Sequence, residues 1–206
     1  MLIDKTIVEL LAETAGDSAV PGGGSIAALS GASAAALVEM VANLTIGKKN
    51  YEDASDLMIG ISEKASLLRV ELLEAVDRDS DAFAKVMEAF KLPKETQEEK
   101  EARTIKIQSA FKQAAIVPLG VAQKSKAVLD LAKDVVLKGN KNAVTDGAVA
   151  GMMARSAALG AIYNVGINLV SIKDEDFVKK VSVEIDEIKA YVIAGEQEIF
   201  SNVVIA

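Results

Sequence analysis

Three aspartates within five residues are the first candidates for proton chemistry in this sequence. Asp77, Asp79 and Asp81 lie in residues 76–83, and the flanking sequence has the apolar spacing of a helix. Aspartate is a poor residue for a helix interior, and Asp77 and Asp81, four residues apart, share a face and repel each other. Asp77 adjoins the apolar stripe, and partial burial would raise its pKa into a range that suits proton transfer. The alternative is a solvated, charged face at a helix end.

The chain of 206 residues contains no histidine and no cysteine. This composition removes the usual general base, the commonest metal ligand and any thiol nucleophile. Acid–base work therefore falls to Asp, Glu, Lys or Tyr. We predict no metal site: zinc is disfavoured, although carboxylates alone could hold Mg²⁺.

A glycine-rich turn precedes a long run of small residues. Gly22, Gly23, Gly24 and Ser25 are followed by an Ala- and Ser-rich segment that extends to Ile46. Glycines let a backbone approach another group closely, and Ser25 stands where it could cap a helix. The free amides and the dipole of such a helix start form an anion site. The alternative is a tight turn in front of a buried helix, because the spacing matches neither the phosphate loop nor the dinucleotide fingerprint.

Two further pairs of polar residues could bind a ligand. Lys48 and Lys49 follow the small-residue segment and could hold carboxylates, or they could be solvated lysines favoured by the helix C-terminal dipole. Asn164 and Asn168 are four residues apart on a second small-residue segment. They could hydrogen-bond to the edge of a ligand or to each other, because buried amides require partners.

The composition indicates one helical domain spanning residues 1–206. Half of the residues are hydrophobic but only 4% are aromatic, and there are three prolines, which favours long and closely packed helices. The net charge of −7 argues against nucleic acid and anionic membranes as partners. The N-terminus lacks the basic region and apolar core of a signal peptide, so we expect a cytoplasmic protein.

Hydrophobic periodicity and capping signals predict an all-α bundle of five to six long helices. Thr96 and Glu99 fit a capping box, Thr145 or Asp146 stands where it could cap a helix, and Pro118 should kink or divide the helix that contains it. The predicted helices cover residues 3–15, 25–46, 53–90, 97–138, 145–172 and 174–202.

The predicted helix over residues 25–46 is apolar all round and long enough to span a membrane. It nevertheless carries Ser30, Ser33, Glu39 and Asn43 and has no aromatic belt, so we predict a buried central helix instead. In a domain of this size, part of its surroundings could come from a second subunit. Small residues would suit such an interface.

Several of these motifs together resemble the cyclodeaminase/cyclohydrolase family of folate enzymes, in the family's order and over nearly the whole chain. Thr145 stands where family members often carry serine, and the formiminotransferase half of the bifunctional members is absent from this sequence. The motifs are Pro-Gly-Gly-Gly-Ser at 21–25, Gly-Lys-Lys-Asn-Tyr at 47–51, Val-Asp-Arg-Asp-Ser-Asp-Ala-Phe at 76–83, Leu-Pro-Lys at 92–94, Val-Pro-Leu at 117–119, Gly-Asn at 139–140 with Thr-Asp at 145–146, and Asn-Val-Gly-Ile-Asn-Leu at 164–169.

The resemblance implies an all-α homodimer with a folate site in a groove at the dimer interface. It implies a tetrahydrofolate derivative as substrate, with or without a polyglutamate tail, and no other cofactor. The first expectation is a deaminase that closes 5-formimino-tetrahydrofolate to 5,10-methenyl-tetrahydrofolate with loss of ammonia. The alternative is a cyclohydrolase that opens the methenyl bridge to 10-formyl-tetrahydrofolate. A second alternative is a folate-binding helical protein without catalysis.

The resemblance also suggests roles for individual residues. By matching position, Asp77 corresponds to the aspartate proposed for cyclodeaminase catalysis, and we predict it as the general acid/base. Asp81 and Asp146 could tune Asp77, bind the pterin's amino-pyrimidinone edge, or cap a helix. Lys48 and Lys49 would bind glutamate carboxylates. The backbone of residues 22–25 would hold a carboxylate or approach the pterin, and Asn164 and Asn168 would contact the ring.

Overall fold

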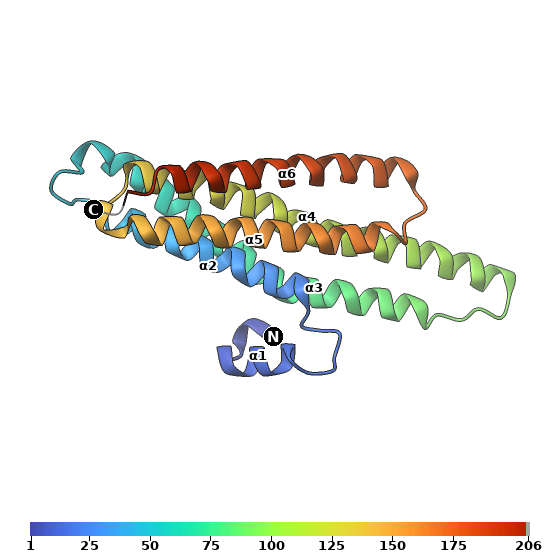
Figure 1. Cartoon of the computed structure of the whole chain (residues 1–206). Helices are drawn as coiled ribbons and strands as arrows, with labels where there is room; N and C mark the ends of the chain where they lie inside the picture. Colours follow the sequence, from blue (N-terminus) through green and yellow to red (C-terminus); the bar gives the residue numbers. More distant parts are fainter. Residues whose placement is uncertain (205–206) are drawn as a thin grey trace.

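The computed structural model describes residues 1–204, and these contain helices and no strands (Figure 1). The predicted all-α fold is therefore confirmed. A short α1 is followed by five long helices. One 3₁₀ turn precedes α1, and two lie between the long helices. The elements are η1 (Leu2–Asp4), α1 (Ile7–Thr14), α2 (Gly23–Asn43), η2 (Glu52–Ala54), α3 (Ser55–Phe90), α4 (Gln97–Lys138), η3 (Lys141–Ala143), α5 (Val144–Leu169) and α6 (Glu175–Ser201).

Four of the long helices form a bundle. α2 packs against α3 and α5, α4 packs against the same two helices, and α6 covers the side formed by α4 and α5. The core residues are small or branched, and Val38, Leu72, Leu129 and Val165 are fully buried. α1 stands apart from the bundle in Figure 1, and Leu10 is the one residue that it buries. The small-residue helices α2 and α5 lie side by side, as close-packing Ala and Gly surfaces allow.

Helix boundaries agree with the sequence where a side chain caps the helix. Thr96 and Glu99 form the predicted capping box of α4, and Asp174 accepts a hydrogen bond from the Phe177 amide at the start of α6. Thr6 and Glu9 form a second capping box, so α1 begins at Ile7 rather than at residue 3.

Two predictions about helix caps are wrong, and of the two outcomes predicted for Pro118, the division of its helix does not occur. Gly22 is the N-cap of α2, and Ser25 lies buried in its first turn, where its hydroxyl donates to the Val76 carbonyl at 2.9 Å. Neither Thr145 nor Asp146 caps α5, which continues directly from η3 with Ala143 as the N-cap. Pro118 does not divide α4: it is buried within one helix of 42 residues.

Among residues 1–204, α2 alone has the length and apolar composition of a membrane span, and 56% of its most apolar window is buried inside the bundle. This burial agrees with the prediction of a central helix. The residues of α2 that are not buried include the apolar Met40 and also the polar Ser33, Glu39 and Asn43.

Candidate functional site

A cavity of about 420 Å³ lies at the end of the bundle where α2 begins. This volume is within the range of small-molecule sites. Its walls come from the loop before α2, the first turn of α2, and the facing parts of α3, α4 and α5. The lining residues are Ala19, Val20, Gly22, Gly23, Gly24, Asp79, Ala82, Phe83, Val86, Phe111, Ala114, Asn164, Ile167, Asn168 and Ser171.

One wall of the cavity is apolar. α3 and α4 extend past the start of α2 and form a second, smaller hydrophobic cluster, in which Ala82, Val86 and Ala114 are buried and Phe111 packs against them. Phe83, from α3, lines the same wall and is 40% exposed. Two aromatic rings and several methyl groups therefore offer a surface on which a flat ring system can pack.

The polar wall is formed by the first turn of α2 and by two asparagines of α5, and Asp79 adjoins it from α3. Among residues 1–204, Asp79 is the one ionisable residue that lines the cavity. Asp79 extends from α3 towards the first turn of α2, where the Ser25 backbone N–H donates to its carboxyl. The Ser25 hydroxyl lies 3.3 Å from Asp79 Oδ2 and shares its one proton between this oxygen and the Val76 carbonyl at 2.9 Å. Burial raises the pKa of the Asp79 carboxyl above its ordinary value, and the hydrogen bonds from Ser25 oppose that shift only in part. A carboxyl with a raised pKa in a ligand-sized cavity is a candidate proton-transfer group.

Gly24 is required for this arrangement. A Cβ atom at Gly24 would lie 2.5 Å from Asp79 Cγ, so only glycine leaves room for the carboxyl against the start of α2. The close approach places the carboxylate at the positive end of the α2 dipole. The glycine-rich turn thus holds an anion as its sequence suggested, but that anion is a side chain of the protein itself.

Asn164 and Asn168 contribute amide groups from α5. The Asn164 Nδ2 donates to the Gly160 carbonyl at 2.9 Å, and the Asn168 Nδ2 donates to the Asn164 carbonyl at 2.7 Å and to the Ala114 carbonyl at 3.1 Å. Among residues 1–204, no hydrogen bond reaches the Oδ1 of either side chain. These two oxygens are therefore acceptors that the polar wall can offer to a ligand.

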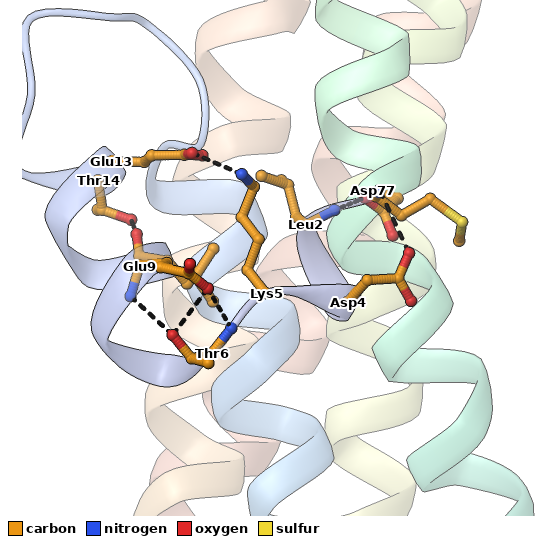
Figure 2. A network of polar contacts seen from close by, with 10 residues as sticks. Leu2, Asp4, Lys5, Thr6, Glu9, Glu13, Thr14 and Asp77 are labelled. Carbon is orange, nitrogen blue, oxygen red and sulfur yellow. Dashed lines mark hydrogen bonds and ion pairs between the residues drawn. The ribbon is translucent and has the colours of Figure 1, made fainter.

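The two aspartates that the sequence put forward in this helix lie elsewhere. Asp77 is half-buried, and its Oδ1 accepts a hydrogen bond from the Leu2 backbone N–H at 2.5 Å (Figure 2). Asp81 is exposed. Neither lines the cavity. The structure brings Gly22, Gly23 and Gly24 together with Asp79, and the predicted catalytic role of Asp77 and Asp81 stays a prediction.

The remaining predicted site residues lie at the other end of the bundle. Asp146 is in the first turn of α5, and eighteen residues of helix, about 27 Å, separate it from Asn164. Lys48 and Lys49 are exposed and follow the C-terminus of α2, far from Gly24 at its start. Within one chain, these three residues and the cavity therefore cannot share a small ligand. Residues 1–204 contain no group of three or more His, Cys, Asp or Glu arranged to hold a metal ion.

Reasoning from the sequence noted all three aspartates but chose Asp77 and Asp81 over Asp79, and it missed the aromatic wall, although a signal for Asp79 was present. Asp79 follows Leu72, Ala75 and Val76 and precedes Ala82, so it falls on the apolar stripe of α3 at helical spacing. A carboxylate on the buried face of a helix is a stronger sign of function than one beside it.

Comparisons with known proteins agree with the motifs. The model of the formiminotransferase-cyclodeaminase family matches residues 6–187. A methenyltetrahydrofolate cyclohydrolase of Methylorubrum extorquens is 40% identical over 200 residues, which cover 97% of this chain and 96% of that protein. A formimidoyltransferase-cyclodeaminase of Gallus gallus is 37% identical over 88% of this chain, which spans about a third (34%) of that longer protein. The solved structure of a formiminotetrahydrofolate cyclodeaminase from Thermotoga maritima covers 98% of both chains at 32% identity, with a TM-score of 0.88. This chain thus belongs to the formiminotransferase-cyclodeaminase family, as its motifs predicted.

Proposed function

We propose that this chain is a folate enzyme that acts, in the cavity at the start of α2, on the carbon carried between N5 and N10 of tetrahydrofolate. The observation that carries the proposal is the half-buried carboxyl of Asp79, which among residues 1–204 is the one ionisable group lining that cavity. Family membership indicates a tetrahydrofolate derivative as the substrate, and the cavity could hold the pterin end of that substrate, where the reaction takes place. No cofactor other than the folate is needed for the chemistry below.

The two walls suit the two sides of a reduced pterin. Phe83 and Phe111 provide an apolar surface for the ring. From α5, Asn164 and Asn168 present their side-chain oxygens to ring N–H groups, and Asp79 is left to face the one-carbon unit. In this arrangement the carboxyl is close to the atoms that exchange protons, as general acid–base catalysis requires.

In the cyclohydrolase reaction, water adds to the methenyl carbon. The Asp79 carboxylate takes a proton from the attacking water, and a tetrahedral carbon bonded to N5, N10 and the new hydroxyl forms. The same carboxyl then returns the proton to N5 as the carbon–N5 bond breaks. The hydroxyl proton leaves to solvent, and 10-formyl-tetrahydrofolate results. A carboxyl with a raised pKa suits both halves of this sequence, because it must accept a proton and then give it back.

In the cyclodeaminase reaction, Asp79 again takes a proton and gives it back, but between different atoms. N10 attacks the carbon of the protonated formimino group, and Asp79 takes the N10 proton. The proton passes to the amino nitrogen of the tetrahedral intermediate, which leaves as ammonia when the carbon–nitrogen bond breaks. The positive charge remains on the methenyl product.

Of these two reactions, we put the cyclohydrolase first. The support is the Methylorubrum extorquens relative, which matches this chain nearly end to end at 40% identity. The deaminase is the second candidate. It is the first expectation from the motifs alone, and the similarity to the Thermotoga maritima cyclodeaminase structure supports it. The residues that line the cavity do not distinguish the two reactions, so an assay has to separate them.

We also propose that two copies form a dimer through the outer faces of α2 and α5. Both helices turn an apolar surface away from α3 and α4, and Met40, Met152 and Tyr163 on that surface are exposed. Its two charged residues bind neighbouring helices instead: Glu39 pairs with Arg69, and Arg155 pairs with Glu196. A contiguous apolar surface without free charge is typical of an interface between subunits.

The activity can be tested with the purified protein and two substrates. Absorbance of the methenyl group should fall when 5,10-methenyl-tetrahydrofolate is offered, faster than in buffer alone, if the protein is a cyclohydrolase. The same absorbance should rise with 5-formimino-tetrahydrofolate if it is a deaminase. The Asp79→Asn variant serves as the protein control and should lose most of either rate. If the wild-type protein changes neither substrate, it is not an enzyme of this class.

A further inference from the structure

The N-terminal segment, residues 1–22, lies outside the bundle and yet forms part of the cavity. η1 lies on α3, α1 stands apart (Figure 1), and the loop that follows brings Ala19 and Val20 into the cavity wall. α1 itself attaches the segment weakly, because Ile7 and Val8 are 75% and 77% exposed. The position of this wall therefore depends on how the two ends of the segment are held.

The far end of the segment is held by α2, and the near end is held by Asp77. The Oδ1 of Asp77 accepts the Leu2 N–H at 2.5 Å, and the Leu2 side chain packs against the core. Other polar contacts of the segment run within it, between Thr6 and Glu9 or between Lys5 and Glu13 (Figure 2). Among residues 1–204, the bond between Leu2 and Asp77 is the one hydrogen bond that joins residues 1–21 to the bundle.

An aspartate at position 77 costs the folded protein stability. Its second oxygen, Oδ2, is buried and has no hydrogen-bond partner among residues 1–204. An oxygen of a carboxylate left in this state opposes folding, and an apolar residue would avoid the cost. Residues that lower the stability of the fold in this way are expected where they serve function.

The geometry of α3 keeps Asp77 away from any ligand in the cavity. Asp77 and Asp79 are two residues apart, which is a rotation of about 200° around the helix axis. Since Asp79 lines the cavity, Asp77 points to the other side of α3, where it meets η1. An effect of Asp77 on catalysis must therefore pass through the N-terminal segment.

We propose that Asp77 is a positioning residue: it anchors the N-terminal segment to α3, so that Ala19 and Val20 hold their places in the wall of the cavity. The proposal rests on the folate activity proposed above, since that activity is what the wall would serve. It assigns to Asp77 a role different from the acid–base role that the family resemblance suggests.

Two substitutions at Asp77 separate these roles. Asp77→Asn keeps an oxygen that accepts the Leu2 N–H but loses the charge, whereas Asp77→Ala loses both. For a positioning residue, Asp77→Ala should raise KM for the folate substrate about tenfold, the effect of losing about one such hydrogen bond. kcat and the pH profile should stay unchanged, and Asp77→Asn should restore a KM within about twofold of the wild type. Glu74→Ala, at an exposed position of the same helix, is the matched control and should change neither constant.

A second pair of variants tests the anchor from its other side, in case Asp77→Ala fails to fold. Leu2→Pro removes the N–H donor, and Leu2→Ala removes the same apolar contact but keeps the donor. Hydrogen exchange of residues 1–22 should be faster in Leu2→Pro than in Leu2→Ala, and faster in Asp77→Ala than in Asp77→Asn.

Two results would overturn the proposal. One is an Asp77→Asn variant that binds folate normally but has lost turnover, which would make Asp77 catalytic. The other is an exchange rate of residues 1–22 that none of the four substitutions changes. If the wild-type protein converts neither folate substrate, the proposed function fails separately. The positioning role is then decided by the exchange rates together with the Kd of tetrahydrofolate, which Asp77→Ala should raise and Asp77→Asn should not.

Discussion

The carboxyl of Asp79 is subject to two opposing effects on its charge. Burial raises its pKa, and hydrogen bonds from the hydroxyl and backbone of Ser25 lower it, with burial the larger effect. The folded protein therefore binds this proton more tightly than the unfolded chain does. The stability that protonation contributes is complete below the ordinary pKa of about 3.9 and is lost as the pH rises through the higher folded value.

This linkage predicts how Asp79→Asn behaves with pH. Asparagine fills a similar volume but does not titrate, so the variant avoids the cost of burying a charge. Its free energy of unfolding should rise relative to that of the wild type as the pH goes from about 4 towards neutrality, while turnover falls by about 10²- to 10⁴-fold. Urea unfolding at several pH values measures the first effect. A stability difference that does not vary with pH would contradict the assignment of a raised pKa.

Gly24 offers a test of how closely the carboxyl must be placed. In Gly24→Ala, the new methyl group would meet Asp79 Cγ at 2.5 Å, so the carboxyl has to move away from the start of α2. A displacement of this kind should lower kcat/KM by about 100-fold, with little change in the cooperativity of unfolding. Gly60→Ala, in α3 with no atom within 4 Å of the new methyl, is the matched control. It should keep full activity and gain about 0.5–1 kcal/mol of stability. Equal activities of the two variants would mean that the position of Asp79 does not matter.

Single site residues could be predicted from the sequence where a local pattern marks them, but not where their role depends on which helix they face. The glycine-rich turn and the two asparagines of α5 were chosen from local patterns. Its three glycines and both asparagines line the cavity, whereas Ser25 is buried behind it. The choice among three neighbouring aspartates could not be made locally, because it depends on which side of α3 faces the start of α2. Phe83 and Phe111 line the cavity together only because α3 and α4 lie side by side past the start of α2.

At the scale of elements, boundaries were predictable where a side chain makes the cap. Thr96 and Asp174 start α4 and α6 as expected, since a capping residue acts within its own turn. Ser25 looked like a cap from its position, but it lies in the first turn of α2 and binds the carbonyl of Val76 on another helix. Pro118 remains inside α4, where neighbouring helices bury it. The positions of Ser25 and Pro118 within their helices depend on tertiary packing, which cannot be predicted from the neighbouring residues in the sequence.

At the end of the bundle opposite the cavity, Asn140 links the C-terminal ends of α2 and α4. Its backbone N–H donates to Thr45 Oγ1 at 2.8 Å, and its side chain donates to the Leu44 carbonyl at 3.0 Å. Asn140→Ala should lower the free energy of unfolding by about 1–3 kcal/mol, because the hydrogen bonds of the buried Asn140 side chain are lost. KM should not change, since this turn lies at the opposite end of the bundle from the cavity.

Asn142→Ala is the control for this prediction, because the Asn142 backbone N–H that binds Asn140 Oδ1 is kept. A rise in KM on Asn140→Ala, with Asn142→Ala unchanged, would show that the far end of the bundle contributes to folate binding. That result would favour the role predicted for the nearby Lys48 and Lys49.

At the scale of the whole molecule, the two broad sides of the bundle differ. The side formed by α3 and α4 is exposed and carries charged residues, such as Glu71, which pairs with Lys124. The side formed by α2 and α5 carries an apolar surface, and the cavity opens near its end, beside the strongly exposed Tyr163 and Ile167. Apolar residues around the cavity would be covered if a second copy bound to this side. A dimer would therefore also limit access of water to the cavity.

Substitutions on the two sides test the dimer directly. Met152→Lys places a charge on the apolar surface of α5, away from the cavity, where a second copy would have to bury it without a partner. The dimer should weaken by about 100-fold or more, and sedimentation at micromolar concentration should find monomers. Leu67→Lys, at an equally large apolar residue on the side of α3 and α4, should remain dimeric, because no interface is expected there. A wild-type protein that sediments as a monomer at all concentrations would refute the interface. If Met152→Lys is monomeric and also loses activity while Leu67→Lys keeps it, the cavity needs the second copy to function.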